Sequence, residues 1–117
     1  MFKVPKKVKE RITDSLKRFQ PIIQTAATRD VNETDTVTIV KDFFSDCFGY
    51  DKYSELTSEF CIKGTYCDLA VKVKGEVKLL VEVKAPGVSL KESHIKQAVD
   101  YATNSGLEWV ILTNSVE

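Results

Sequence analysis

The chain has 117 residues, 43% hydrophobic and 29% charged, a composition typical of one soluble globular domain. Its formal net charge is zero, which excludes a strong general attraction to nucleic acid, so any phosphate contact must come from local clusters of basic residues. No apolar run approaches the roughly 20 residues of a membrane helix, and the basic start lacks the features of a secretory signal. No membrane partner is therefore expected.

The first predicted element is an amphipathic helix over residues 6–19, with basic side chains between its apolar positions. Those apolar positions are Val8, Ile12, Leu16 and Phe19. The basic face either meets a phosphate backbone or is only solvated, and solvation is the more common outcome. Pro21 is expected to end or restart the helix, and small polar residues predict a loop over 24–32.

A second helix is predicted over residues 33–48. Asn32 can cap its start, the acids Glu33 and Asp35 suit the positive end of its dipole, and Gly49 can end it. Its expected buried face consists of Val37, Val40, Phe44, Cys47 and Phe48.

The period then changes to that of strands. Residues 54–62 carry a weak strand pattern, and 66–73 and 77–84 alternate clearly. The three residues 74–76 separate the last two strands as a hairpin turn. Pro86-Gly87 breaks the chain after it.

A third helix is predicted over 89–105, and its apolar stripe consists of Ile95, Ala98, Val99 and Ala102. Residues 108–113 follow as a short apolar strand, expected to be central in the sheet and buried on both faces, with Trp109 in the core. The resulting fold class is α/β (α+β): a mixed four-stranded sheet flanked by helices in the order αβββαβ, after an extra N-terminal helix.

The three cysteines, Cys47, Cys61 and Cys67, argue against a disulfide framework and against a zinc site, because their number is odd and no CxxC pair occurs. Each lies among apolar residues and is expected to be a small core group. A reducing, cytoplasmic location fits this usage.

Three charged residues on the predicted hairpin suggest chemistry. Glu82 and Lys84 are two apart on one strand and so share a face. A three-residue turn would place Asp68 directly opposite Glu82, with Cβ atoms about 5 Å apart. A two-residue turn would place it on the other face unless a bulge intervenes. Two such carboxylates repel unless a proton or cation lies between them, and oxygen ligands suit Mg²⁺.

Lys84 would then lie beside the metal, where an ammonium group can orient a water or stabilise charge on a phosphate. The alternative is an ordinary ion pair between Lys84 and Glu82 or Asp68 on a solvated sheet edge.

The stretch GTYCDLAVKVKGEVKLLVEVKAPG, followed by IKQAVDYATNSGLEWVILTNS, resembles the PD-(D/E)xK nuclease superfamily. More narrowly, it is similar to the N-terminal nuclease domain of type I restriction endonuclease R subunits. The resemblance covers about residues 32–115. It implies a restriction-endonuclease-like core there, preceded by the basic helix of residues 1–21 within one domain, 1–117.

The resemblance also implies roles for individual residues. Asp68 and Glu82 correspond to the acidic metal ligands, Lys84 to the catalytic lysine, and the main-chain carbonyl of Val83 to a further metal contact. Glu33 matches an acidic, metal-associated residue that opens the first core helix.

The family's QxxxY motif falls on Gln97 and Tyr101, which lie four apart on one helix face. The resemblance implies that both point toward the active site. One departure is Cys67, which stands where the nominal motif has proline before the aspartate.

The sequence thus predicts a restriction–modification endonuclease that uses Mg²⁺, with Mn²⁺ as a substitute, to hydrolyse DNA phosphodiester bonds. One alternative is a DNA-binding or assembly module of the same fold that needs a partner subunit to cleave. An unrelated α/β interaction domain is disfavoured by the intact Asp68, Glu82 and Lys84 set. The expected partners are DNA and either a second copy of the chain or a motor or specificity subunit.

Overall fold

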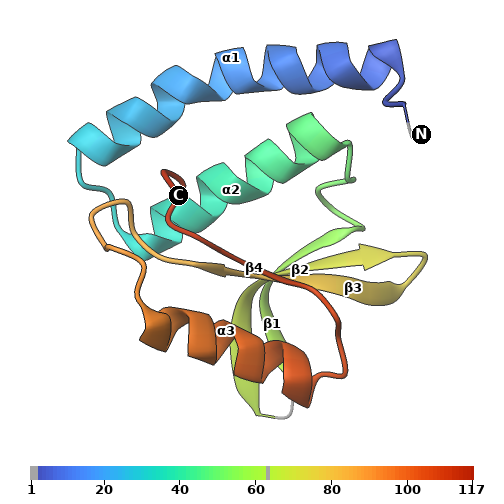
Figure 1. The fold of residues 1–117 in the computed structure, drawn as a ribbon, viewed down its shortest axis with the longest axis vertical. Coiled ribbons are helices and arrows are strands. Elements are labelled where there is room, and N and C mark those ends of the chain that lie inside the picture. The colour runs from blue at the N-terminus through green and yellow to red at the C-terminus, as the bar shows by residue number, and fades with distance from the viewer. Residues whose placement is uncertain (1–2, 63) are drawn as a thin grey trace.

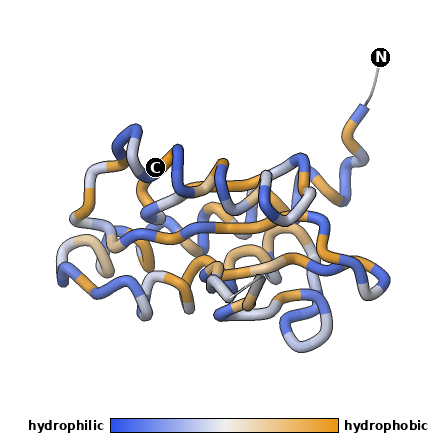
Figure 2. The backbone as a smooth tube through the Cα atoms, turned by 90° about the horizontal axis from the view of Figure 1, so that it is seen from below, coloured by the Kyte–Doolittle hydropathy of each residue, from blue (hydrophilic) through white to orange (hydrophobic). Residues whose placement is uncertain are grey.

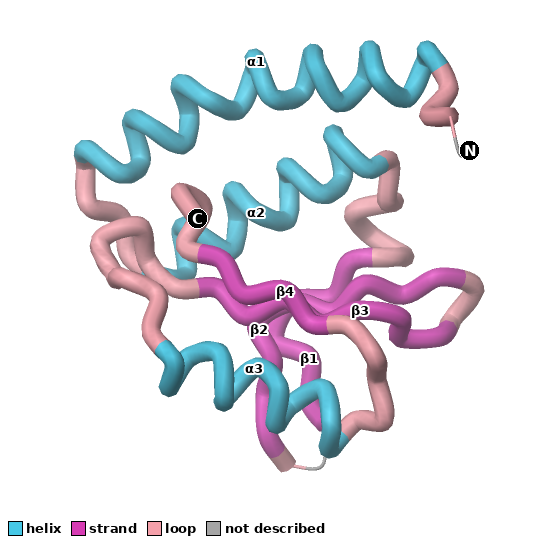
Figure 3. The backbone as a smooth tube through the Cα atoms, viewed as in Figure 1, coloured by secondary structure: helices cyan, strands magenta, loops and turns pink. Residues whose placement is uncertain are grey.

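One helix covers each face of a mixed four-stranded sheet, and the N-terminal helix packs on the outside of one of them (Figures 1 and 3). The computed structural model describes residues 3–62 and 64–117. Its elements are α1 (Lys6–Thr28), α2 (Glu33–Phe48), β1 (Leu56–Ile62), β2 (Thr65–Val73), β3 (Glu76–Val83), α3 (Glu92–Asn104) and β4 (Val110–Thr113). The strand order is β1-β2-β3-β4; the first two pairings are antiparallel and β3–β4 is parallel. The predicted fold class and element order are confirmed.

Helix α2 forms as predicted from its capping residues. The Asp35 N–H donates to Asn32 Oδ1 at 2.8 Å, and Gly49 ends the helix with a left-handed φ of 79°. Val40 and Phe44 then pack on the sheet as part of the larger core, with Leu56, Leu69, Val71, Val81 and Val83. Phe48, predicted to be buried, is instead exposed at the helix end. Figure 2 shows hydrophobic segments running through the strands and hydrophilic residues at the β2–β3 turn.

Helix α1 is longer than predicted, because it continues through Pro21 to Thr28. A proline inside a helix removes one backbone hydrogen bond and usually ends or kinks the helix. Here buried side chains on both sides of the proline, Phe19 and Ala26, hold the two halves against the rest of the protein. The predicted loop over 24–32 is therefore shortened to the few residues after Thr28.

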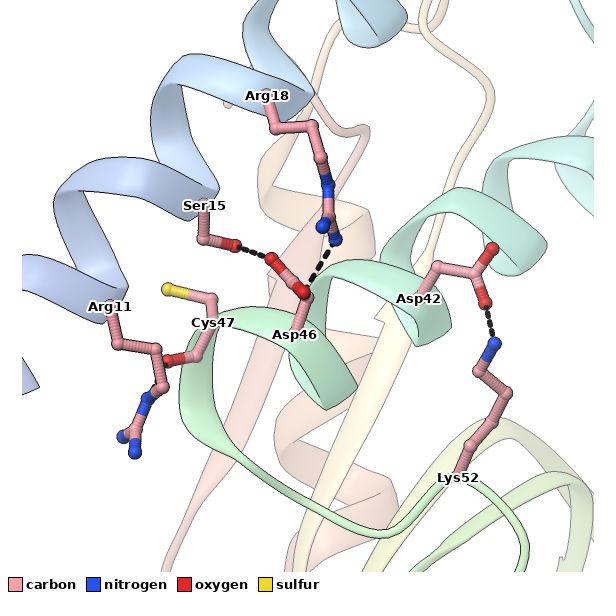
Figure 4. A network of polar contacts seen from close by, with 7 residues as sticks. All are labelled: Arg11, Ser15, Arg18, Asp42, Asp46, Cys47 and Lys52. Carbon is pink, nitrogen blue, oxygen red and sulfur yellow. Dashed lines mark hydrogen bonds and ion pairs between the residues drawn. The ribbon is translucent and has the colours of Figure 1, made fainter.

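Polar contacts fasten α1 to α2 (Figure 4). The buried Ser15 hydroxyl donates to Asp46 Oδ2 at 2.7 Å, and Arg18 forms an ion pair with the other carboxylate oxygen. Arg11 Nε donates to the main-chain oxygen of Cys47 at 3.0 Å. The Ser15 hydrogen bond is the main reason that the pKa of Asp46 lies below its ordinary value. Charged residues of α1 that face α2 are thus used in packing.

Strand β4 corrects a prediction made from its apolar sequence. It lies at the edge of the sheet, paired only with β3 in the described part of the chain, and is not central. Trp109, predicted to be in the core, is 69% exposed. An apolar run of this length looks the same at an edge as in the centre, because strand order is set by pairing and not by composition.

Helix α3 lies on the opposite face of the sheet from α2 (Figure 1). Of its predicted apolar stripe, Ala98 and Ala102 are buried, whereas Ile95 is 54% exposed and Val99 is also exposed. The two buried residues of this stripe are therefore both alanines.

Two of the three cysteines are core groups as predicted. Cys47 and Cys67 are buried, but Cys61 is exposed. Among the described residues, no helix combines the length and the hydropathy needed to cross a bilayer.

Candidate functional site

The register of the β2–β3 hairpin determines whether Asp68 faces Glu82. The turn has two residues, since Val73 pairs with Glu76, so the predicted three-residue turn is wrong. By itself that turn would place the two carboxylates on opposite faces. However, the register shifts between Val71 and Lys72, and beyond the shift Leu69 pairs with Val81. One step further along this register, Asp68 is opposite Glu82, so the bulge supplies the extra residue that the turn lacks.

Asp68 lies where β2 leaves the regular pairing with its neighbours. The β1–β2 pairing passes from Ser58↔Leu69 to Phe60↔Cys67 and omits Glu59, whose φ is 51°. The Val83 N–H donates to Asp68 Oδ2 at 2.8 Å. This hydrogen bond takes the place of a backbone hydrogen bond between β2 and β3, and it holds the Asp68 carboxylate against the end of β3.

Glu82 is the most unusual carboxylate in the described part of the chain. It is 5% exposed, and its Oε1 has no hydrogen-bond partner among the described residues. Its pKa is raised, first by burial and then by the negative charge of Asp68, while Cys67, the Asp68 amide and Lys84 act in the opposite direction. A buried carboxylate with an unpartnered oxygen is costly unless a proton or cation reaches it.

Lys84 and Val83 lie at the end of β3 beside this carboxylate. The Lys84 N–H donates to the main-chain oxygen of Thr113 at 2.8 Å, which continues the parallel pairing of β3 with β4. The ammonium group is close enough to lower the pKa of Glu82. Within the described residues, however, it forms no ion pair within 4.0 Å, so the simple ion-pair alternative lacks the expected contact.

The segment that follows Lys84 is held in place by two distant parts of the chain. The buried Asn114 side chain donates from Nδ2 to the main-chain oxygen of Val88 at 2.8 Å. A Cβ added at Gly87 would lie 2.7 Å from Asp30 Oδ1, so the chain passes close to a side chain of the α1–α2 loop here. These contacts fix the direction in which the chain leaves the site.

Helix α3 brings Tyr101 toward the carboxylates. Tyr101 packs beside Cys67 and Leu80, and its pKa is raised by burial and then by the charge of Glu82. Gln97 contacts Tyr101 and lowers that pKa, but it is exposed and lines a hollow on the side of α3. The structure therefore brings Tyr101 to the site, and Gln97 only as its neighbour.

Glu33, at the start of α2, shares a cavity of about 230 Å³ with Asp68. The other lining residues are Thr34, Val37, Thr38, Ser58 and Glu59. In residues 3–62 and 64–117, no three His, Cys, Asp or Glu side chains are grouped closely enough to hold a metal ion. Glu33 is thus near Asp68 but does not complete a three-carboxylate site.

The donor set at the site fits a hard divalent cation. Asp68 and Glu82 provide carboxylate oxygens on neighbouring strands, and Glu82 Oε1 is buried and unpartnered. Mg²⁺ is bound by few carboxylates and retains several waters, so two carboxylates and a main-chain carbonyl, such as that of Val83, are sufficient.

We expect Glu82→Gln to stabilise the protein in EDTA at neutral pH, because the variant removes a buried charge beside Asp68. The pKa of Glu82 in the folded state lies above its ordinary value of 4.5, so its ionisation costs stability as pH rises from 4.5 through the folded-state pKa. The advantage of the variant should disappear below pH 4.5, where the carboxyl is protonated in both states. Each kcal/mol gained raises the melting temperature of such a domain by about 4 °C. Thermal melts at several pH values check this; a clearly less stable variant at pH 7 would contradict it.

Comparison with known proteins identifies one family. The sequence model of the type I restriction enzyme R protein N terminus matches residues 38–117, more than half of the chain. The match includes most of α2, all four strands and α3, and so every residue proposed above for the site except Glu33. No curated protein and no solved structure gives a significant match.

Proposed function

This chain belongs to the family of the type I restriction enzyme R protein N terminus, and on that premise we propose that it is a Mg²⁺-dependent endonuclease domain of a restriction system, hydrolysing DNA phosphodiester bonds. The observation that supports this most strongly is Glu82, whose buried carboxylate keeps one oxygen unpartnered beside Asp68. The same proposal includes membership of the PD-(D/E)xK superfamily, which the motif formed by Asp68, Glu82 and Lys84 supports.

In this proposal Asp68, Glu82 and the carbonyl of Val83 hold the ion. Bound Mg²⁺, for which Mn²⁺ substitutes, supplies Lewis acidity toward a phosphate oxygen and lowers the pKa of a water. The Lys84 ammonium orients the attacking water and stabilises the negative charge that develops on the phosphate. Glu33 lines the same cavity as Asp68 and contacts the ion through a bound water in this proposal.

From α3, Tyr101 limits the space around the Glu82 carboxylate, and Gln97 orients the Tyr101 phenol. Both have supporting roles in this proposal, because Tyr101 lies near the Glu82 carboxylate and Gln97 contacts only Tyr101.

DNA, and a second copy or a motor or specificity subunit, are the proposed partners, and the cytoplasm is the proposed location. The family match to one part of a restriction enzyme supports the proposal that partner subunits deliver the DNA. The chain itself has no net charge with which to attract DNA over long range.

We expect modest DNA affinity that falls steeply with salt, because phosphate contacts must come from local lysines and arginines. Exposed lysines on α1 are one source. Because α1 packs on α2, these lysines lie on the α2 side of the sheet, opposite α3 (Figure 1). Each phosphate neutralised on duplex DNA contributes about −0.9 to the slope of log affinity against log salt. Fluorescence anisotropy with a labelled duplex at several salt concentrations measures the slope. Tight binding that does not change with salt would exclude this mode of contact.

The experiment that tests the function is plasmid nicking by the purified protein with Mg²⁺ or Mn²⁺. Wild type should nick, Asp68→Ala should not, and Glu76→Gln should behave as wild type, because Glu76 is an exposed residue at the far end of β3. DNA binding without nicking would support the alternative, a binding or assembly module that needs a partner to cleave. Equal nicking by wild type and Asp68→Ala would overturn the site assignment.

A further inference from the structure

Cys67 forms a cross-strand contact at the level of the two carboxylates. Its side chain is 1% exposed, and its sulfur lies 3.4 Å from the main-chain oxygen of Val81 and 3.5 Å from that of Leu69. The thiol also lies beside the Glu82 carboxylate, whose charged form it stabilises. The thiol, a weak donor, is thus surrounded by acceptors on two strands.

This contact lies where the backbone pairing of β2 with β3 gives way to side-chain contacts. The last backbone pair before the carboxylates is Leu69↔Val81. Beyond it, Cys67 Sγ reaches Val81, the residue before Glu82, and Asp68 Oδ2 receives the N–H of Val83, the residue after Glu82. These two contacts therefore bracket Glu82 and set its position relative to Asp68.

We propose that Cys67 is a positioning residue, whose thiol contacts the main chain of Val81 and so holds the adjoining Glu82 where its carboxylate forms the cation site with Asp68. The inference rests on the proposed function, since it concerns the same carboxylates. Two observations support it: the sulfur contacts across the strands, and the buried, unpartnered Glu82 Oε1. A cysteine that only fills space would need no such acceptors. Cys47 is equally buried but lies on α2 and not on the hairpin, so it serves as the control.

The test is Mn²⁺ titration by calorimetry on the full chain, with thermal melts of each variant. Cys67→Ala and Cys67→Val remove the donor, and valine keeps most of the volume. Cys67→Ser keeps a donor, and Cys47→Ala is the matched control. We expect the alanine and valine variants to lose on the order of tenfold or more in Mn²⁺ affinity, as when the hydrogen-bond partner of a metal ligand is removed. The serine variant should retain most of the affinity, and Cys47→Ala should lose stability without losing affinity.

The outcomes separate this inference from the function on which it rests. If wild type binds Mn²⁺ through Asp68 and Glu82 but the folded Cys67→Val variant binds it equally well, the positioning role is wrong and the metal site stands. If Cys67→Ser loses as much affinity as Cys67→Val, a retained donor does not preserve Mn²⁺ binding, which also overturns the inference. If wild type itself shows no Mn²⁺ binding that depends on Glu82, the proposed function fails first.

Discussion

Lys84→Ala is expected to reduce DNA cleavage by on the order of a hundredfold or more and to leave the affinity for Mn²⁺ unchanged or slightly improved. An ammonium group cannot ligate a cation, so the ion loses nothing and is freed from a neighbouring positive charge. The loss should appear in turnover, because the charge on the phosphate develops in the transition state. Removing one electrostatic stabiliser of this kind typically costs about 10²–10³ in rate.

The measurement is metal titration and plasmid nicking on one preparation. Lys78→Ala is the matched control, because Lys78 is also on β3 but is exposed and paired with Glu76 at 2.8 Å. Lys84→Ala that cuts as fast as wild type would show that Lys84 has no catalytic role, even with the fold and metal site intact. Gln97→Ala should change cleavage in the same direction but by less, since Gln97 contacts the site only through Tyr101.

The second large effect is expected for metal binding. Replacing Asp68 and Glu82 together with alanine should abolish Mn²⁺ binding measured by calorimetry, because the two carboxylates on neighbouring strands are the proposed oxygen ligands. In a Mn²⁺-soaked crystal of wild type, oxygen ligands should lie at roughly 2.0–2.2 Å, completed by water. Glu76→Gln serves as the control on the same strand.

Equal Mn²⁺ affinity of wild type and the double variant would exclude the site. The double variant relieves the buried charge of Glu82 but leaves the Val83 N–H without its Asp68 acceptor, so its folding in EDTA is checked by a thermal melt. A loss of binding by a variant that is still folded at the titration temperature identifies the carboxylates as ligands.

The hairpin shows how far sequence reasoning reached at the site. Alternation along the two strands predicted that Glu82 and Lys84 share a face, and required an odd-length turn or a bulge for Asp68 to join them. The structure has a two-residue turn and a bulge between Val71 and Lys72. The bulge could not be located from the sequence. The registers with and without it both bury apolar side chains along these strands, and they differ only in which residues of β2 and β3 are paired.

For helix α3 the sequence predicted which residues share a face, but not which of them reach the site. The spacing of Gln97 and Tyr101 placed them on one helix face, but it could not tell how far that face extends into the site. Tyr101 lies close enough to Glu82 for the carboxylate to raise its pKa, whereas Gln97 is an exposed neighbour of Tyr101. The contribution of Cys67 was likewise missed, since a cysteine among apolar residues resembles any small core residue; its place immediately before Asp68 was the one available signal.

Features that arise within a few residues of each other could be predicted from the amino-acid sequence. Asn32 and Gly49 set the ends of α2, and the change from helical to strand period set the element order, because capping and side-chain alternation act locally. Three features could not be predicted in this way: the continuation of α1 through Pro21, the edge position of β4, and the opposition of Asp68 and Glu82. Each of these depends on contacts between segments distant in sequence, whose packing and pairing energies outweigh the local preferences.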